Sequence, residues 1–124
     1  MEKVLYNIQG IFIIEGTKGD VKCAFNGFFE YDPVEKGLTG KLYDHFGFSS
    51  IRGKMTESQL EFAKKHPDRS NEIYYKFGRF KDAWTGNWED FKGKGQANCF
   101  TTPCDNPISR QLYEQIFKVR RKTL

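Results

Sequence analysis

The residue types that most often carry chemistry are few in this sequence and stand far apart. Cys99 and Cys104 form one loose pair, and His45 or His66 would have to complete a zinc site with them. A structural zinc site needs four converging ligands, usually with closely spaced cysteines such as Cys-x-x-Cys. The sequence therefore predicts no metal site. The three cysteines are expected to be reduced thiols, with Cys23 a small core residue.

Acid–base and nucleophilic catalysis have equally little support. His45 follows Asp44 at an expected hairpin corner, where a carboxylate could orient an imidazole as a general base, but a solvated turn is the preferred interpretation of the pair. No Ser lies in a nucleophile elbow, and Gly16-Thr17-Lys18-Gly19 lacks the length and the following helix of a phosphate loop. The sequence predicts no catalytic residue and no cofactor, and it favours a non-enzymatic protein while leaving an enzyme open.

Two cations and a set of aromatic side chains are the better candidates, and they indicate binding. Arg52 and Lys64 are the cations best placed to approach an inward or rim position, where either could meet the carboxylate of an amphipathic guest. Tyrosines add an aromatic body with one polar atom. Hydrated cations and ordinary core tyrosines are the plainer interpretations. The candidate ligand-binding residues are Tyr6, Phe25, Phe29, Arg52, Lys64, Tyr75, Trp84 and Trp88.

Composition indicates the elements that must position these residues. The chain has 124 residues, among them twelve Phe, six Tyr and two Trp, and this aromatic share favours strands over helices. A chain of this length buries enough surface for one core, so residues 1–124 are expected to form a single domain. Strand-like runs alternate with short turns throughout 4–103, and these connections leave no room for crossover helices. The runs are 4–15, 20–31, 38–44, 47–55, 58–65, 72–80, 83–90 and 93–102.

Glycines inside the runs indicate strongly coiled strands. If each glycine points inward, one consistent and mostly apolar face results, whereas the parity of the run around Tyr74 and Tyr75 stays open. The expected inward residues are Tyr6, Ile8, Phe12, Ile14, Val21, Cys23, Phe25, Phe29, Tyr31, Leu38, Leu42, Ile51, Met55, Trp84 and Trp88.

The end of the chain changes period and predicts a C-terminal helix over 107–121. Asn106 and Pro107 are a good N-cap and first-turn pair. An apolar stripe of Ile108, Leu112, Ile116 and Val119 follows, and we expect it to pack on outward apolar residues of the strands. The candidates for that dock are Ile11, Ile13 and Phe28.

Charge and hydropathy narrow the possible partners. The formal charge is +4, and a surplus of three positive charges lies after Cys104, where the end of the helix favours basic residues. This distribution argues against a nucleic-acid interface. No apolar stretch has the length of a membrane span, and the start of the chain is not typical of a signal peptide, so we expect a cytoplasmic protein.

Eight short strands in up-and-down order, with glycines in their middles and one late helix, resemble the calycin-like barrels: lipocalins, fatty-acid-binding proteins and avidins. The resemblance is carried within residues 37–88 by Gly40 to Asp44, Gly47 with Ile51 and Gly53, Leu60-Glu61-Phe62, and Gly86-Asn87-Trp88. It implies an all-β fold, an antiparallel meander of about eight strands forming a small barrel with one C-terminal α-helix. A flattened sandwich remains the alternative to a closed barrel.

A barrel of this size is just wide enough to be filled by its own side chains or to enclose one small ligand. The leading hypothesis is a non-enzymatic binding module for a small apolar or amphipathic molecule, held in the lumen or at its mouth. The alternatives are a ligand-free protein-interaction domain or homodimer, and an enzyme that uses tyrosines and a cation around a small organic acid.

Overall fold

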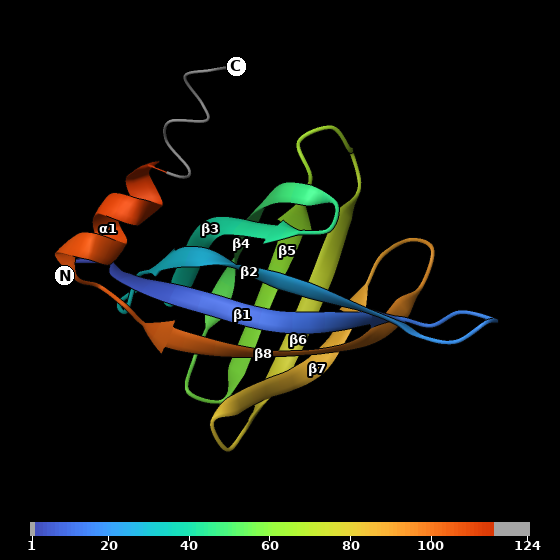
Figure 1. Ribbon diagram of the computed structural model, residues 1–124. Helices are drawn as coiled ribbons and strands as arrows, with labels where there is room; N and C mark the ends of the chain where they lie inside the picture. Colours follow the sequence, from blue (N-terminus) through green and yellow to red (C-terminus); the bar gives the residue numbers. More distant parts are fainter. Residues whose placement is uncertain (1, 116–124) are drawn as a thin grey trace.

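The computed structural model describes residues 2–115, which form an eight-stranded closed β-barrel followed by one short helix, as predicted (Figure 1). Each strand pairs antiparallel with the next, and β8 pairs with β1, so the sheet is a closed barrel and not a sandwich. The strands are β1 (Val4–Ile14), β2 (Val21–Tyr31), β3 (Gly37–Asp44), β4 (Gly47–Met55), β5 (Gln59–Lys65), β6 (Glu72–Phe80), β7 (Ala83–Glu89) and β8 (Lys94–Pro103).

Alternating side chains fill the inside of the barrel, because successive residues of a strand point to opposite faces of the sheet. The inward positions predicted from the glycines are confirmed at nearly all residues. In β6, where the sequence left the parity open, Tyr75 and Phe77 are buried and Tyr74 is 57% exposed. Val21, at the start of β2, is 56% exposed and is the exception. The largest buried apolar side chains are Phe12, Phe25, Phe29, Phe62, Tyr75, Phe77 and Trp84.

Two glycines show why the strands can coil so tightly. A Cβ atom on Gly40 would overlap the carbonyl oxygen of Phe28, and one on Gly53 would overlap the carbonyl oxygen of Glu61. In both cases the backbone of a neighbouring strand occupies the space of the missing side chain. Glycine is therefore required at these points by close approach between strands.

The helix α1 (Pro107–Tyr113) begins as the sequence predicts. Asn106 is the N-cap, its Oδ1 accepting a hydrogen bond from the backbone N–H of Ser109 at 2.9 Å, and a proline opens the first turn. The helix lies at the end of the barrel where β1 begins and β8 ends (Figure 1). The remainder of the predicted helix, 116–121, lies outside the described residues.

The helix contacts Phe28, one of the three predicted dock residues of the barrel, but it does so with a different face from the predicted apolar stripe. Ile108 and Leu112 are 77% and 44% exposed, so this part of the apolar stripe does not rest on the barrel. The ring of Tyr113 instead meets Phe28 of β2 edge-on, with centroids 6.3 Å apart. The segment before the helix runs along β1, where the N–H of Cys104 donates to the carbonyl of Leu5 at 2.9 Å.

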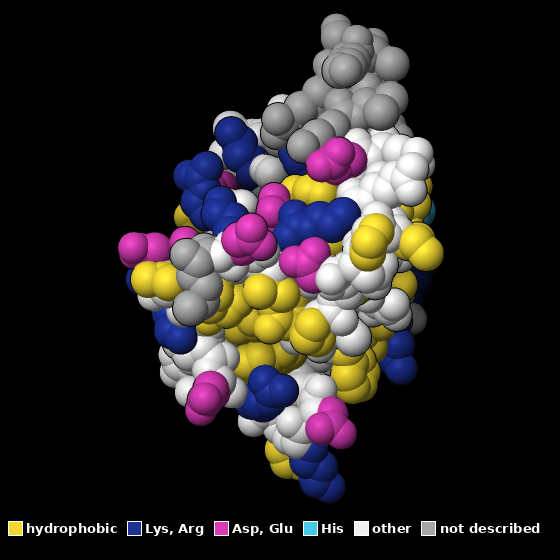
Figure 2. Space-filling model, turned by 90° about the vertical axis from the view of Figure 1, so that its left-hand side faces the viewer, with side chains coloured by type: hydrophobic (Ala, Val, Ile, Leu, Met, Phe, Trp, Pro, Cys, Tyr) yellow, Lys and Arg dark blue, Asp and Glu magenta, His cyan; other side chains and the backbone are white. Residues whose placement is uncertain are grey.

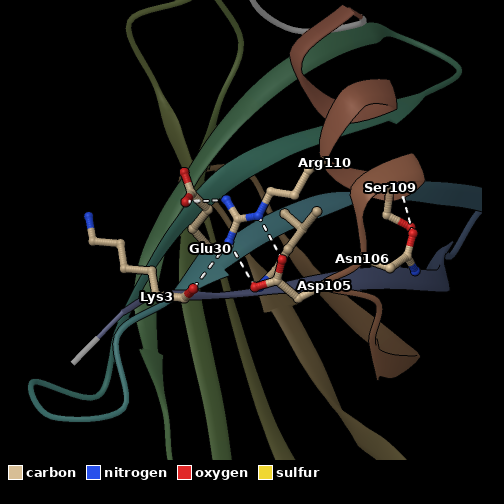
Figure 3. Close-up of polar contacts among 7 residues, drawn as sticks. Lys3, Glu30, Asp105, Asn106, Ser109 and Arg110 are labelled. Carbon is tan, nitrogen blue, oxygen red and sulfur yellow. Dashed lines mark hydrogen bonds and ion pairs between the residues drawn. The ribbon is translucent and has the colours of Figure 1, made fainter.

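A charged cluster fixes α1 to the barrel (Figure 3). The guanidinium of Arg110 donates to both carboxylate oxygens of Asp105 at 2.8 and 2.9 Å, and to Glu30 of β2 at 2.8 Å. It also donates to the carbonyl of Lys3 at 3.1 Å. These hydrogen bonds raise the pKa of Arg110 and lower that of Asp105. The cluster joins the helix, the linker before it, β2 and the residue that precedes β1.

Candidate functional site

The middle of the barrel is occupied by aromatic rings in contact with one another. Phe62 and Tyr75 stack with ring centroids 4.9 Å apart, and Tyr75 also stacks on Phe77 at 6.0 Å. Phe25 meets Tyr75 edge-on at 6.0 Å, and Phe12 does so at 6.4 Å. The sequence left open whether side chains fill the barrel or leave room for a ligand. In this central layer the aromatic rings fill it.

One end of the barrel opens into a pocket of about 590 Å³, which we call the mouth. It lies where β1, β3, β5 and β7 begin and where β2, β4, β6 and β8 end. On this end of the molecule, apolar side chains form a patch bounded by charged ones (Figure 2). The mouth is lined by Tyr6, Tyr31, Lys36, Met55, Thr56, Glu57, Ser58, Arg79, Thr101 and Pro103.

Arg79 and Trp84 form the first of two fixed pairs at the mouth. They face each other in the register between β6 and β7, and the guanidinium carbon lies 4.9 Å from the centroid of the indole ring. Trp84 is itself fixed, because it is 1% exposed and its Nε1–H donates to Thr101 Oγ1 at 3.0 Å. The backbone N–H of Arg79 also donates to the carbonyl of Ser58 at 3.1 Å. The guanidinium of Arg79, an exposed residue, therefore lies over a ring that is itself fixed.

Tyr6 and Tyr31 form the second pair. Tyr6 stacks on Phe29 at 5.2 Å and meets Tyr31 edge-on at 5.9 Å. The hydroxyl of Tyr31 donates to the carbonyl of Met55 at 2.8 Å. Burial raises the pKa of both phenols, so both keep their protons at neutral pH. The mouth thus combines aromatic walls with protonated hydroxyl groups.

A separate polar cluster lies inside the barrel toward its other end. The ammonium group of Lys64 donates to Asp44 Oδ2 at 2.8 Å and to the hydroxyl of Tyr75 at 3.0 Å. The same group lies 4.7 Å from the centroid of the Phe12 ring. Burial lowers the pKa of Lys64, an effect that the hydrogen bond to Asp44 opposes, and burial raises the pKa of Tyr75. Lys64 is only 1% exposed, so this cluster serves the barrel interior and not an open site.

The structure divides the sequence-predicted site residues into separate groups. Tyr6 lines the mouth, with Phe29 and Trp84 packed beneath it. Phe25, Lys64 and Tyr75 belong to the interior. Trp88 is half-buried, and its Nε1–H donates to the carbonyl of Ile13 at 2.8 Å.

The two predicted cations do not reach a guest at the mouth. Arg52 is exposed on the outer face of β4, as its polar parity implies, and it lines a surface groove with Tyr113. Lys64 points inward, but its charge is already paired with Asp44.

Sequence reasoning missed both cations that line the mouth, Lys36 and Arg79. Arg79 shares the inward parity of Tyr75 and Phe77, and this alternation was the signal that could have found it. Asp44 was missed as an interior residue for a similar reason, since it shares the parity of Leu38 and Leu42. A charged residue at a strand end is ordinarily solvated. Parity alone therefore does not show whether such a side chain lies inside the barrel or in water.

The weaker candidates for chemistry do not converge. In residues 2–115 no group of three or more His, Cys, Asp or Glu side chains is arranged to hold a metal ion. Asp44 accepts from Lys64 and from the backbone N–H of Phe46 at 2.8 Å, and His45 is exposed with its ring edge-on to Phe46. The pairing of Asp44 with His45 considered from the sequence is therefore replaced by a pairing with Lys64. Burial raises the pKa of the Cys99 thiol to about 12, well above that of a reactive thiol.

Comparison with known proteins adds no family assignment: no family model matches the sequence, and a search of curated proteins finds no significant match. Over residues 2–115, no helix has the length and apolar character needed to cross a membrane.

Proposed function

We propose that this barrel is a calycin-like binding module that holds a small amphipathic molecule at its mouth and does not transform it chemically. The observation that carries the proposal is the pocket of about 590 Å³ between the strand ends, with aromatic side chains on its walls. The volume of the mouth lies in the range of small-molecule sites, in which aromatic side chains and placed polar groups together orient a ligand. The central layer of rings supports binding at the mouth over binding deep in the lumen.

Tryptophan fluorescence tests this proposal, because Trp84 packs directly under Arg79. A Trp88→Phe variant leaves Trp84 as the one tryptophan of the chain. Titration with small aromatic acids, amides and alcohols is expected to change its emission saturably, and native mass spectrometry is expected to give a one-to-one adduct. A Tyr6→Ala variant, which removes one wall of the mouth, should weaken any such binding. Flat titrations with every class of compound would refute small-molecule binding.

A second candidate function is protein recognition, and one specific surface favours it. At the hairpin between β3 and β4, Tyr43 and Phe46 are 51% and 49% exposed, and Tyr43 contacts Phe48 with ring centroids 4.9 Å apart. Exposed aromatic clusters are common at protein interfaces. Light scattering across a wide concentration range, with a Tyr43→Ser/Phe46→Ser double variant as the comparison, tests whether this hairpin mediates a homodimer.

A further inference from the structure

We propose that the mouth selects a compact, planar carboxylate and that the guanidinium of Arg79 binds its anionic group. This inference rests on the proposed function, because it specifies the class of molecule that the mouth would hold.

The first argument is the state of the charges around Arg79. Within residues 2–115 no carboxylate lies within ion-pair distance of its guanidinium, whereas Arg110 has two acidic partners. Glu57 is the acidic residue among those lining the mouth, against Arg79 and Lys36. The pocket therefore has a positive surplus and a cation whose N–H groups are available to a guest.

The second argument is that two hydroxyl groups at the mouth, those of Thr101 and Tyr6, can donate to a guest. Thr101 Oγ1 already accepts the indole N–H of Trp84 at 3.0 Å, so its own hydroxyl hydrogen is left to donate. In the described part of the chain the hydroxyl of Tyr6 makes no hydrogen bond, and it is protonated for the reason given above. A carboxylate accepts hydrogen bonds without donating any, so it matches this set of donors better than a neutral amide or alcohol does.

The third argument is that Arg79 is positioned before any ligand arrives. Its guanidinium is held over the face of Trp84, which leaves the N–H groups at its edges free to bind a carboxylate. Because Trp84 is buried and hydrogen-bonded, the stack has a firm base. Less side-chain entropy is then lost when a ligand binds.

The fourth argument limits the shape of the guest. Phe29 and Trp84 are 0% and 1% exposed, and they pack against the residues of the mouth from within the barrel. The rings of the central layer continue this packing below them. A long acyl chain would have to displace these rings, whereas a flat, compact body can lie against Tyr6 and Tyr31.

Isothermal titration calorimetry at low ionic strength tests the proposal with three probes: 2-naphthoate, the uncharged 2-naphthamide of the same shape, and palmitate. The naphthoate is expected to bind the wild-type protein about tenfold or more tightly than the amide, as befits a charge-assisted contact. Arg79→Gln should abolish that difference, and Arg79→Lys should keep only part of it. Arg52→Gln, a change of the same kind on the outer face of β4, should leave it intact.

The possible outcomes separate this inference from the proposed function. Equal binding of acid and amide, both weakened by Tyr6→Ala, would overturn the carboxylate preference and leave a binding mouth. A preference for the acid that survives in Arg79→Gln would overturn the role of Arg79. Tighter binding of palmitate than of naphthoate would overturn the limit on shape. No binding of any probe would overturn both proposals. Circular dichroism of each variant checks that it is folded.

Discussion

The ammonium group of Lys64 lies 2.8 Å from the carboxylate of Asp44, and both side chains are almost wholly buried inside the barrel. The two groups come from β5 and from the end of β3, with β4 between them. Removing two charges from water is unfavourable, and their attraction offsets this only while both partners are present.

Removing one partner of this pair is expected to destabilise the protein strongly. Asp44→Asn should lower the free energy of unfolding by about 3–5 kcal/mol, because it leaves the ammonium of Lys64 buried without a counter-charge. The double variant Asp44→Asn/Lys64→Met should be more stable than Asp44→Asn alone, since it removes that charge. Urea unfolding followed by circular dichroism measures all three proteins. A loss below about 1 kcal/mol in Asp44→Asn would contradict the importance of the pair.

The buried thiol of Cys99 predicts a loss of stability at alkaline pH. Its pKa rises from an ordinary value of 9.0 to about 12 in the folded protein, so the unfolded chain gives up this proton first. The stabilisation is complete below about pH 9 and is lost as the pH rises toward about 12, at up to about 1.4 kcal/mol per pH unit. Cys99→Ala should show a shallower decline over this range in urea unfolding. Tyr75 and Lys64 contribute to the pH dependence of both proteins. Parallel curves of stability against pH would therefore contradict a contribution from the Cys99 thiol.

Two glycine substitutions should behave in opposite ways. Gly53→Ala is expected to lower stability by about 1–3 kcal/mol, because its Cβ would overlap the backbone of Glu61 and the strands would have to separate. Gly78→Ala is the matched control, since no atom lies within 4 Å of its added Cβ. Thermal unfolding of both variants should show a clear decrease for the first and little change for the second. Equal effects would show that close strand approach is not the cause.

The cluster around Arg110 should control the attachment of α1 and leave the barrel unaffected. Arg110→Gln removes the ion pairs with Glu30 and Asp105, partly exposed contacts that contribute on the order of 1 kcal/mol together. Hydrogen exchange is expected to become faster at the amides of 108–113 and to stay unchanged in the strands. Arg69→Gln serves as the control, because that guanidinium stacks over Phe46 instead. Unchanged exchange in α1 would contradict the anchoring role.

Much of the barrel could be predicted from the sequence because its determinants are local. Strand ends fall within a residue or two of the predicted ones, since turn residues and two-residue periodicity set them independently of distant partners. The inward parity followed from glycines whose role, as at Gly40 and Gly53, is to admit a neighbouring strand. The N-cap at Asn106 is equally local.

The site could not be predicted to the same degree, because it depends on which strand ends meet in space. Arg79 becomes a mouth residue through its contact with Trp84 and through the closure that brings Thr101 nearby. Lys64 points inward, as its strand position predicted, but its charge is paired with Asp44, twenty residues away in the sequence. The exposure of Ile108 was missed because an apolar stripe on a helix indicates a face that can pack. It does not show whether the barrel offers a surface for that face.

The seam between β1 and β8 has a consequence for how the chain reaches its native state. Each of the other strand pairs joins neighbours in sequence, but this pair joins the first strand to the last. Until the seam forms, both strands expose unpaired N–H and C=O groups along one side, and a second chain can add to such an edge. Contacts between distant segments form slowly, so closure is expected late in folding. Aggregation should therefore compete most strongly just before the seam closes, and much less once it has formed.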